Sequence, residues 1–368
     1  MNVLDFTSYY IVIPLLVLTI LVFVHEWGHF WVARKNKVRV EVFSVGFGPE
    51  LFGWTDSYGT RWKFSAIPLG GYVKMFGEMD VKDKKADSAI KMTPEEKSVA
   101  FCFKSLGQRA AIVVAGPAVN FIFAIIAFAI LAVSTGTPVP LAGIGKVFSN
   151  SAAEKAGFLP GDRVVSINKQ PIKYFEQLRN IVQRDGEKYL SFLVERNNKI
   201  ILIKAKPQIR VQKNAANETQ ASYILGVSWD PDYTEYEKHN PIVALWIGVE
   251  RTWALSIKIL EYIGDIFFAN QSTDDLGGPL RIAKISGDMA QKGLEDVILL
   301  MAVLSVNLGL INLFPIPMLD GGHLLFYAIE GIMRRPLGEK IQEYSFRFGL
   351  LLILTLFIFV SWNDIVNF

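Results

Sequence analysis

The sequence predicts a polytopic α-helical membrane protein of about four transmembrane helices that carries one inserted α+β domain. Three observations support this: four long apolar stretches, a mixed segment of alternating β-like runs, and an apolar composition of 51% hydrophobic residues with a mean hydropathy of +0.30. A chain of 368 residues is long enough for several spans and a folded domain. The small net charge of +3 argues against nucleic-acid binding, and the single Cys102 allows neither an intramolecular disulfide nor a cysteine zinc cluster.

The four apolar stretches approach the roughly 20 residues that a helix needs to cross a bilayer. They extend from about Tyr9 to Ala33, within Ala110 to Gly145, from Val297 to Leu319, and from Phe348 to Trp362. The fourth is short, so we expect it to lie with little tilt. No Lys or Arg precedes the first apolar run, which argues for a retained first span over a cleavable signal peptide.

Basic residues indicate the orientation of the spans. They gather in segment 34–109 and between the third and fourth spans, at Arg34, Lys35, Lys37, Arg39, Lys82, Lys84, Lys85, Arg109, Arg334, Arg335 and Lys340. Short basic loops face the cytoplasm. We therefore expect both termini, and the segment from about Thr137 to Lys292, to lie outside the cytoplasm.

The outer segment divides into parts of different pattern. Residues 139–207 alternate short β-like runs with one helical stretch near Tyr174 to Arg184. The polar stretch 209–240 reads as a linker with one hairpin. Residues 241–268 have apolar positions at helical spacing and sparse charges, which predicts an amphipathic helix on the membrane surface or against the spans.

The sequence HEWGH in the first span predicts a metal site. On a helix, His25 and His29 are one turn apart on the same face and can share one tetrahedral metal. Glu26 points to the neighbouring side, where it can take a proton from a metal-bound water. Ionisable groups are costly inside an apolar span, which favours a functional site over a structural polar cluster. Arg34 follows His29 by about 7 Å along a helix, so the site is expected near the cytoplasmic face.

A catalytic zinc ion usually takes a third protein ligand. The third span has the same direction as the first, and it ends near the same face in NLFPIPMLDGGH, which contains Asp320. Pro315 and Pro317 break the helix there. Asp320 is our predicted third ligand. A capping Asp in a helix-terminating turn is the alternative, and His323 is a weaker rival for the third position.

These motifs resemble those of the site-2 protease family, peptidase family M50, and most closely its branch of bacterial regulator of sigma-E proteases. The elements that carry the resemblance are HEWGH at 25–29, Asn312 to Gly321 (NLFPIPMLDG), GFGP at 46–49, IPLGGYVKMFGE at 67–78, AGPAVNF at 115–121, LGGPLRI at 276–282 and VNLGLINLF at 306–314. The resemblance covers nearly the whole chain. It implies a membrane-associated β-hairpin region between the first two spans.

The resemblance also implies a function: zinc-dependent cleavage of single-span membrane proteins within the bilayer. Its substrates would be anti-sigma factors and signal-peptide remnants, with one Zn²⁺ per chain and Glu26 activating the zinc-bound water. Asn312 and Asn307 would hold the substrate backbone or the oxyanion. The 67–76 hairpin, with Gly70, Gly71 and Tyr72, would hold the substrate extended by β-augmentation, although a plain cytoplasmic loop is an equal alternative.

NSAAEKAGFLPGDRVVSINKQPI at 150–172 resembles a PDZ domain of the protease-associated kind. Such a domain would bind the extracytoplasmic part of a substrate as an extended peptide. Lys169 stands where relatives often carry Gly, which concerns only the local turn. Some relatives have two tandem PDZ domains, whereas one such motif is visible here.

The resulting organisation places the protein in a bacterial inner membrane, with the termini and the PDZ domain periplasmic. The expected segments are 1–34 (first transmembrane helix), 35–109 (cytoplasmic loop with the re-entrant hairpin), 110–136 (second transmembrane helix), 137–208 (PDZ domain), 209–296 (linker and amphipathic helical region), 297–325 (third transmembrane helix), 326–343 (cytoplasmic loop) and 344–368 (fourth transmembrane helix). The alternatives are a membrane-embedded PDZ scaffold without activity and a polytopic carrier. The carrier would have paired hydrophobic halves, which the sequence lacks.

Overall fold

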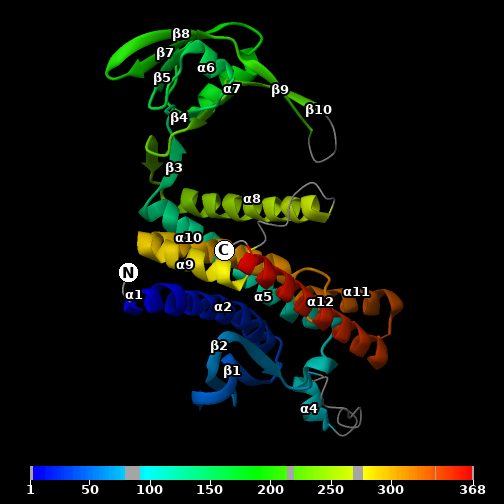
Figure 1. Cartoon of the computed structure of the whole chain (residues 1–368). Coiled ribbons are helices and arrows are strands. Elements are labelled where there is room, and N and C mark those ends of the chain that lie inside the picture. The colour runs from blue at the N-terminus through cyan, green and yellow to red at the C-terminus, as the bar shows by residue number, and fades with distance from the viewer. Residues whose placement is uncertain (1–2, 79–91, 214–218, 268–276, 336, 367–368) are drawn as a thin grey trace. The chain divides into compact units, whose positions relative to one another are not determined.

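The computed structural model describes residues 3–78, 92–213, 219–267, 277–335 and 337–366 (Figure 1). Lys82, Lys84 and Lys85 of the predicted basic loop and Leu276 of the LGGPLRI motif lie outside the described residues. The chain divides into two compact units, Met1–Leu131 with Pro241–Phe368, and Ala132–Asn240.

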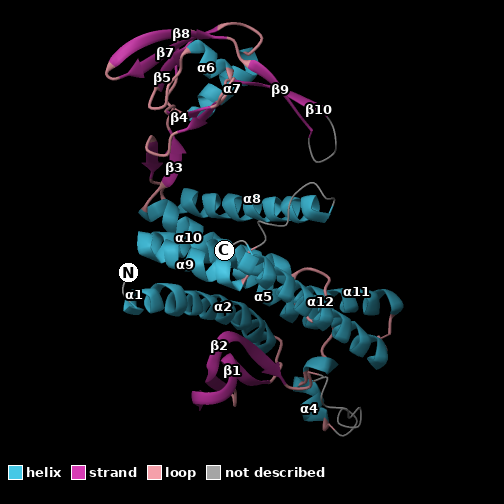
Figure 2. Cartoon of the chain, viewed as in Figure 1, coloured by secondary structure: helices cyan, strands magenta, loops and turns pink. Residues whose placement is uncertain are grey.

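The first unit consists mainly of helices (Figure 2). Its elements are α1 (Val3–Thr7), the π-helical turn η1 (Ser8–Val12), α2 (Ile13–Lys35), β1 (Val40–Thr55), β2 (Arg61–Met75), α4 (Pro94–Val99), the 3₁₀ turn η2 (Phe101–Phe103), α5 (Leu106–Ser134), α8 (Pro241–Phe267), α9 (Pro279–Lys292), α10 (Leu294–Asn312), α11 (Asp320–Met333) and α12 (Glu339–Val366). Among the described residues, four helical segments are long and apolar enough to cross a membrane: Asp5–Lys35, Leu106–Ser134, Leu294–Asn312 and Lys340–Val366. The predicted four candidate spans are therefore confirmed.

The third apolar stretch differs from the sequence interpretation, because it is not one continuous helix. α10 ends at Asn312, the chain turns, and α11 begins at Asp320 and continues through residues that we interpreted as a loop. Two prolines in the turn remove main-chain donors, which prevents the helix from continuing. The fourth span is also longer than predicted, since the polar residues before Phe348 continue the helix and pair as Glu343 with Arg347.

The predicted hairpin between the first two spans is present as β1 and β2, which are antiparallel and strongly bent. The first part of β1, around Phe43, pairs with both Trp62 and Val73 of β2, whereas the second part of β1 pairs only with the start of β2. The rows of the sheet therefore follow the order 50–55, 61–67, 40–47, 71–75. Within the described part of the chain, residues 71–75 have a strand neighbour on one side only, so they form an edge. Phe30 of α2 packs on Trp62, with ring centroids 5.0 Å apart.

The second unit is an α+β domain. Its elements are β3 (Thr137–Pro140), β4 (Ile144–Val147), α6 (Ala152–Ala156), β5 (Arg163–Ile167), β6 (Gln170–Pro171), α7 (Phe175–Asp185), β7 (Leu190–Arg196), β8 (Lys199–Ala205), β9 (Gln208–Lys213), β10 (Thr219–Ile224), β11 (Val227–Trp229) and β12 (Thr234–Glu237). Four strands form a sheet in the order β6-β5-β7-β8, and α7 buries Leu178, Ile181 and Val182 in the core. The strands and helix that the sequence predicts over 139–207 are present.

The segment 209–240 contains the predicted hairpin, β9 with β10, but it is more than a linker. β11 pairs with β4, and β12 pairs with β3. The end of this segment therefore pairs with the first strands of the domain and belongs to it. The partner strands are far apart in sequence, and local patterning carries no signal for such a pairing.

Candidate active site

Three potential metal ligands come together in the helical unit. α2 presents His25 and His29 one turn apart, and both residues are buried, each with 8% of its surface exposed. Their Nε2 atoms are 3.3 Å apart. Asp320 Oδ2, from the first turn of α11, lies 3.2 Å from His25 Nε2 and 3.5 Å from His29 Nε2. The residues predicted as ligands from the sequence are thus placed together by two helices.

The donor set fits a zinc ion. Zinc bonds to nitrogen and oxygen are about 2.0–2.2 Å long, so two ligand atoms of a tetrahedral ion lie about 3.3–3.5 Å apart. The three observed separations fall close to this value. Asp320 Oδ2 is buried and has no hydrogen-bond partner among the described residues, which a cation would remedy. A fourth, open position is what a catalytic site needs.

The break after α10 positions the carboxylate. α11 begins where Asp320 stands, and Gly322 lies so close to the carbonyl groups of the preceding turn that a Cβ there would overlap Ile316 O. His323 follows Asp320 by about one helical turn. Its ring lies among aromatic side chains, with the centroid of the Phe346 ring 5.4 Å away. Among the described residues, the group of potential metal ligands contains His25, His29 and Asp320, and His323 is not a member.

α5 supports both histidines from behind. His29 Nδ1 is 2.9 Å from the carbonyl oxygen of Ile112, and His25 Nδ1 is 3.0 Å from Asn120 Nδ2. Gly116 lies between Ile112 and Asn120 in α5, and a Cβ on it would overlap the imidazole rings of both histidines. Our sequence analysis gave Asn120 no role. A side-chain amide in a long uncharged span is costly unless it has a hydrogen-bond partner. The presence of Asn120 in such a span is the sequence feature that indicates a role for it.

Glu26 lies between the cluster and the hairpin. Its carboxylate accepts a hydrogen bond from the main-chain amide of Val73, and a Cβ on Gly71 would lie 3.6 Å from Glu26 Cγ. The edge row 71–75 therefore passes directly beside Glu26. A strand edge, an acid and a metal-ligand cluster are thus adjacent.

The remaining predicted site residues have less definite surroundings. Gly70 and Tyr72 are neighbours of Gly71 in β2, and Gly70 adopts a φ of +120°, which favours glycine. Asn307 and Asn312 lie in α10, and Asn312 is its last residue. The structure gives neither asparagine side chain a hydrogen bond to another described residue.

At the end of α2, the hairpin is fixed by Asp56. Its carboxylate accepts hydrogen bonds from the amides of Tyr58 and Thr60 and from Trp62 Nε1, and Arg34 Nη1 lies 3.1 Å away. Burial opposes ionisation of this carboxyl, but the hydrogen bonds and the nearby guanidinium outweigh it and hold the pKa of Asp56 below its ordinary value.

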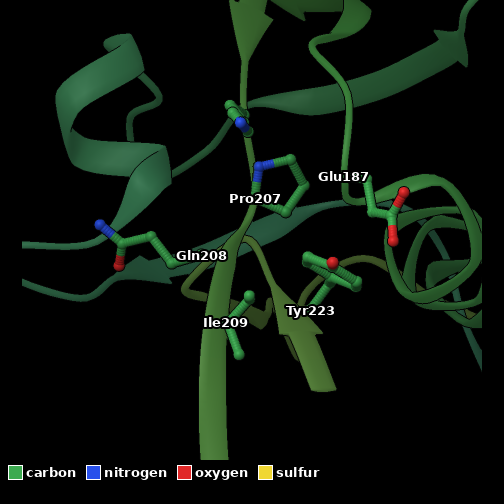
Figure 3. Close-up of a pocket in the computed structure, with 6 residues that line it drawn as sticks. Glu187, Pro207, Gln208, Ile209 and Tyr223 are labelled. Carbon is green, nitrogen blue, oxygen red and sulfur yellow. The ribbon is translucent and has the colours of Figure 1, made fainter. Parts of the chain in front are cut away.

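A pocket of about 530 Å³ lies in the second unit, at the base of the β9–β10 hairpin (Figure 3). Its lining residues are Glu187, Lys206, Pro207, Gln208, Ile209 and Tyr223. Partial burial and the neighbouring Glu187 raise the pKa of Tyr223. The pocket is apolar on the Pro207 and Ile209 side, and Glu187 and Lys206 give it one acid and one base.

Known proteins resemble this chain along nearly its full length. The family model described as peptidase family M50 matches residues 13–356. The chain belongs to peptidase family M50. A candidate zinc metalloprotease of Rhizobium meliloti (strain 1021) is 42% identical, with 98% of each chain covered. The metalloprotease MmpA of Caulobacter vibrioides is 32% identical over 95% of this chain and 94% of its own length.

A more distant relative is the regulator of sigma-E protease RseP of Salmonella typhimurium, which is 30% identical over 95% of this chain and 97% of its own length. Membership of the M50 family and the four candidate spans make the chain a multi-pass membrane metalloprotease with zinc as its metal. Membrane proteins follow as its class of substrate. The resemblance that the sequence motifs indicated is confirmed.

Proposed function

We propose that this M50 protease cuts single-span membrane proteins within the bilayer, with His25, His29 and Asp320 holding one zinc ion and Glu26 acting as general base. One observation carries the proposal: three ligand atoms converge at 3.2–3.5 Å from one another, on helices of the membrane-type bundle. Bound zinc supplies a Lewis acid for the attacking water and the scissile carbonyl.

The residues of the chain perform the proton transfers. Glu26 lies beside the metal ligands and outside their set, so its carboxylate is free to take a proton from the attacking water. The same carboxyl then returns the proton to the leaving amine. The hydrogen bond from the Val73 amide holds the carboxylate toward the hairpin. The acid therefore sits where an extended substrate segment would meet the water.

The edge row 71–75 of the hairpin is the proposed substrate platform. A helical peptide bond cannot be attacked while its carbonyl is hydrogen-bonded and enclosed by the helix, so the substrate must be unwound. An unpaired strand edge offers it main-chain partners, which is β-augmentation. Gly71 lets this row lie close to β1 and α2, since a Cβ on it would overlap Ser44 O and contact Val22. Gly70, Gly71 and Tyr72 are assigned to this role.

Asn312 and Asn307 are proposed to hold the substrate backbone or the oxyanion. Their amides have no other partner among the described residues and lie in α10, which packs against α2. An amide N–H₂ aimed at the developing oxyanion would stabilise it through a hydrogen bond.

The second unit is proposed to be a PDZ domain in the periplasm that contacts the extracytoplasmic part of the substrate. Support comes from its mixed strands, from α7, and from the pocket beside Tyr223 and Ile209 (Figure 3). The boundaries given by β3 and β12 extend this domain from the proposed 137–208 to about 137–237. Both termini lie in the periplasm in this scheme, with the active site near the cytoplasmic face of the inner membrane.

Anti-sigma factors are the proposed natural substrates, with signal-peptide remnants as a second group. The name of the Salmonella relative, a regulator of sigma-E protease, favours the first group. The sequence alignment with that relative extends over 444 positions, more than the 368 residues of this chain, so the relative has additional residues.

Reporter cleavage in membranes tests the catalytic assignment. Glu26→Gln should leave zinc bound while cleavage of a single-span reporter falls by about 10²–10⁴-fold, the usual contribution of a general acid–base group. Glu295→Gln, an exposed change in the first turn of α10, is the matched control and should cleave normally. Normal cleavage by Glu26→Gln would show that Glu26 is not the base.

A further inference from the structure

Asn120 occupies an unusual position for an amide. It lies in α5, in the part of the candidate span that contains no charged residue, and its surface is completely buried. Its Nδ2 atom is 3.0 Å from His25 Nδ1, while Oδ1 is buried without a partner among the described residues. Its main-chain oxygen accepts a hydrogen bond of 2.9 Å from Ser305 Oγ of α10. The residue is thus fixed between two helices, and its side chain meets a proposed metal ligand.

The chemistry of metal binding determines which end of the amide must face His25. An imidazole binds zinc through an unprotonated Nε2 only if Nδ1 carries the proton. The neighbouring histidine already meets this condition, because His29 Nδ1 faces the carbonyl of Ile112, which can only accept a hydrogen bond. His25 Nδ1 needs an acceptor as well. The carboxamide of Asn120 is the polar group within reach of it.

The oxygen and nitrogen of an amide have nearly the same shape, and their assignment follows from the hydrogen-bond network. A half-turn about the terminal bond of the side chain exchanges them without moving the backbone. With Oδ1 toward His25, the Nδ1–H donates to Asn120 and the Nε2 lone pair points to Asp320 and the metal position. With Nδ2 toward His25, Nε2 would carry a proton and could not bind a metal ion.

We infer that Asn120 is a positioning residue of the zinc site: its carboxamide oxygen accepts the Nδ1–H of His25 and thereby fixes both the tautomer and the ring orientation of that ligand. This rests on the proposed zinc ligands. α5 then contributes no metal ligand, yet it fixes both histidines, one through a main-chain carbonyl and the other through a side chain eight residues later. Only the second of these contacts can be changed by substitution.

The test is a chelator competition that measures zinc affinity in the purified full-length protein. Asn120→Leu keeps the volume but removes the acceptor, and zinc should bind about 10–100-fold more weakly, as for other residues that orient a metal ligand. Asn120→Asp keeps an acceptor and should bind zinc at least as tightly as the wild type. Thr252→Val is the matched control, since Thr252 Oγ1 is another buried polar atom without a partner. It should leave zinc affinity unchanged.

The outcomes separate this inference from the ligand assignment. His25→Ala should lose zinc if the ligand set is right, whatever Asn120 does. Wild-type zinc affinity in Asn120→Leu, or equal losses in the Leu and Asp variants, would overturn the role of Asn120 alone. If the Leu variant does not fold, Asn120→Asp suffices. In the zinc-loaded protein, the proton on His25 Nδ1 should then move downfield in nuclear magnetic resonance spectra, with that of His29 unchanged. No selective movement would refute the inference.

Discussion

The carboxylate of Asp364, near the end of α12, accepts a 2.7 Å hydrogen bond from the main-chain amide of Gly278, just before α9. Oδ2 of the same carboxylate accepts two more bonds, from the amides of Leu280 and Arg281. The first amides of a helix have no partner within it, so Asp364 caps α9 from 83 to 86 residues away. A side chain at the end of the chain thereby stabilises a helix that precedes α10.

Asp364→Ala should therefore destabilise the helical unit by about 1–3 kcal/mol, because three main-chain amides, one buried and two partly buried, lose a charged acceptor. The measurement is the midpoint of thermal unfolding in detergent. Glu343→Ala, on the same helix, removes only an exposed ion pair with Arg347 and should change the stability by less than about 1 kcal/mol. Equal midpoints for the two variants would contradict the capping role.

Gly116→Ala should lower both zinc content and cleavage, because the added methyl group would overlap the rings of His25 and His29. Gly107→Ala is the matched control on the same helix, since nothing lies within 4 Å of a Cβ there. The control should keep full zinc content. We expect metal analysis to separate the two variants clearly, and a zinc-loaded Gly116→Ala would mean that α5 does not contact the site as described.

The stability of the fold should depend on pH through Asp56, which holds the hairpin. A carboxyl whose pKa is lower in the folded than in the unfolded chain stabilises the fold above its ordinary pKa, here 3.8, and this stabilisation disappears as the pH falls through the lower, folded value. Asp56→Asn should thus lower the unfolding midpoint at pH 7, and the difference from the wild type should shrink below about pH 4. Asp232→Asn, at an exposed position, is the control. A difference that stays constant down to pH 3 would contradict this.

Cross-linking can locate the substrate. Cys102 is the single cysteine, so Cys102→Ser provides a background without thiols. In that background and with Glu26→Gln, Tyr72→Cys should form a disulfide with a cysteine placed near the scissile bond of a reporter. Tyr58→Cys, exposed elsewhere on the hairpin region, should not. Equal yields at both positions would argue against the edge row 71–75 as the platform.

Removal of zinc should destabilise the protein as well as inactivate it. A ligand that binds only the folded state at 100 times its Kd stabilises by about 2.7 kcal/mol. Chelation should lower the unfolding midpoint of the wild type, and added zinc should restore it. Asp320→Asn should gain less from added zinc than Glu295→Gln does. An unfolding midpoint that does not change with zinc in any variant would exclude a buried metal site whose occupancy stabilises the fold.

Much of the site could be predicted from the sequence, because its parts obey simple geometry. The histidines are one helical turn apart, and parallel spans bring their corresponding ends to the same depth, which placed Asp320 beside His25 and His29. The strands over 139–207 also carry a local pattern. Contacts between residues far apart in the sequence leave no such local pattern. Asp364 caps a helix some 85 residues earlier, and β12, at the end of the second domain, pairs with β3 at its start. For Asn120 the sequence offers one weak signal, an amide within an uncharged span, and its partner His25 is visible only in the structure.

The unpaired edge beside Glu26 has a consequence for which segments can be cut. Every hydrogen bond that a helix gives up in lipid must be replaced, and a short edge can replace only a few. The free-energy difference between helix and extended strand therefore becomes a selection criterion. Segments rich in Gly, Asn or β-branched residues lose little on unwinding, whereas a uniform run of Leu and Ala loses much. The enzyme would then select substrates by the low stability of their helix. The identity of any single side chain would matter little.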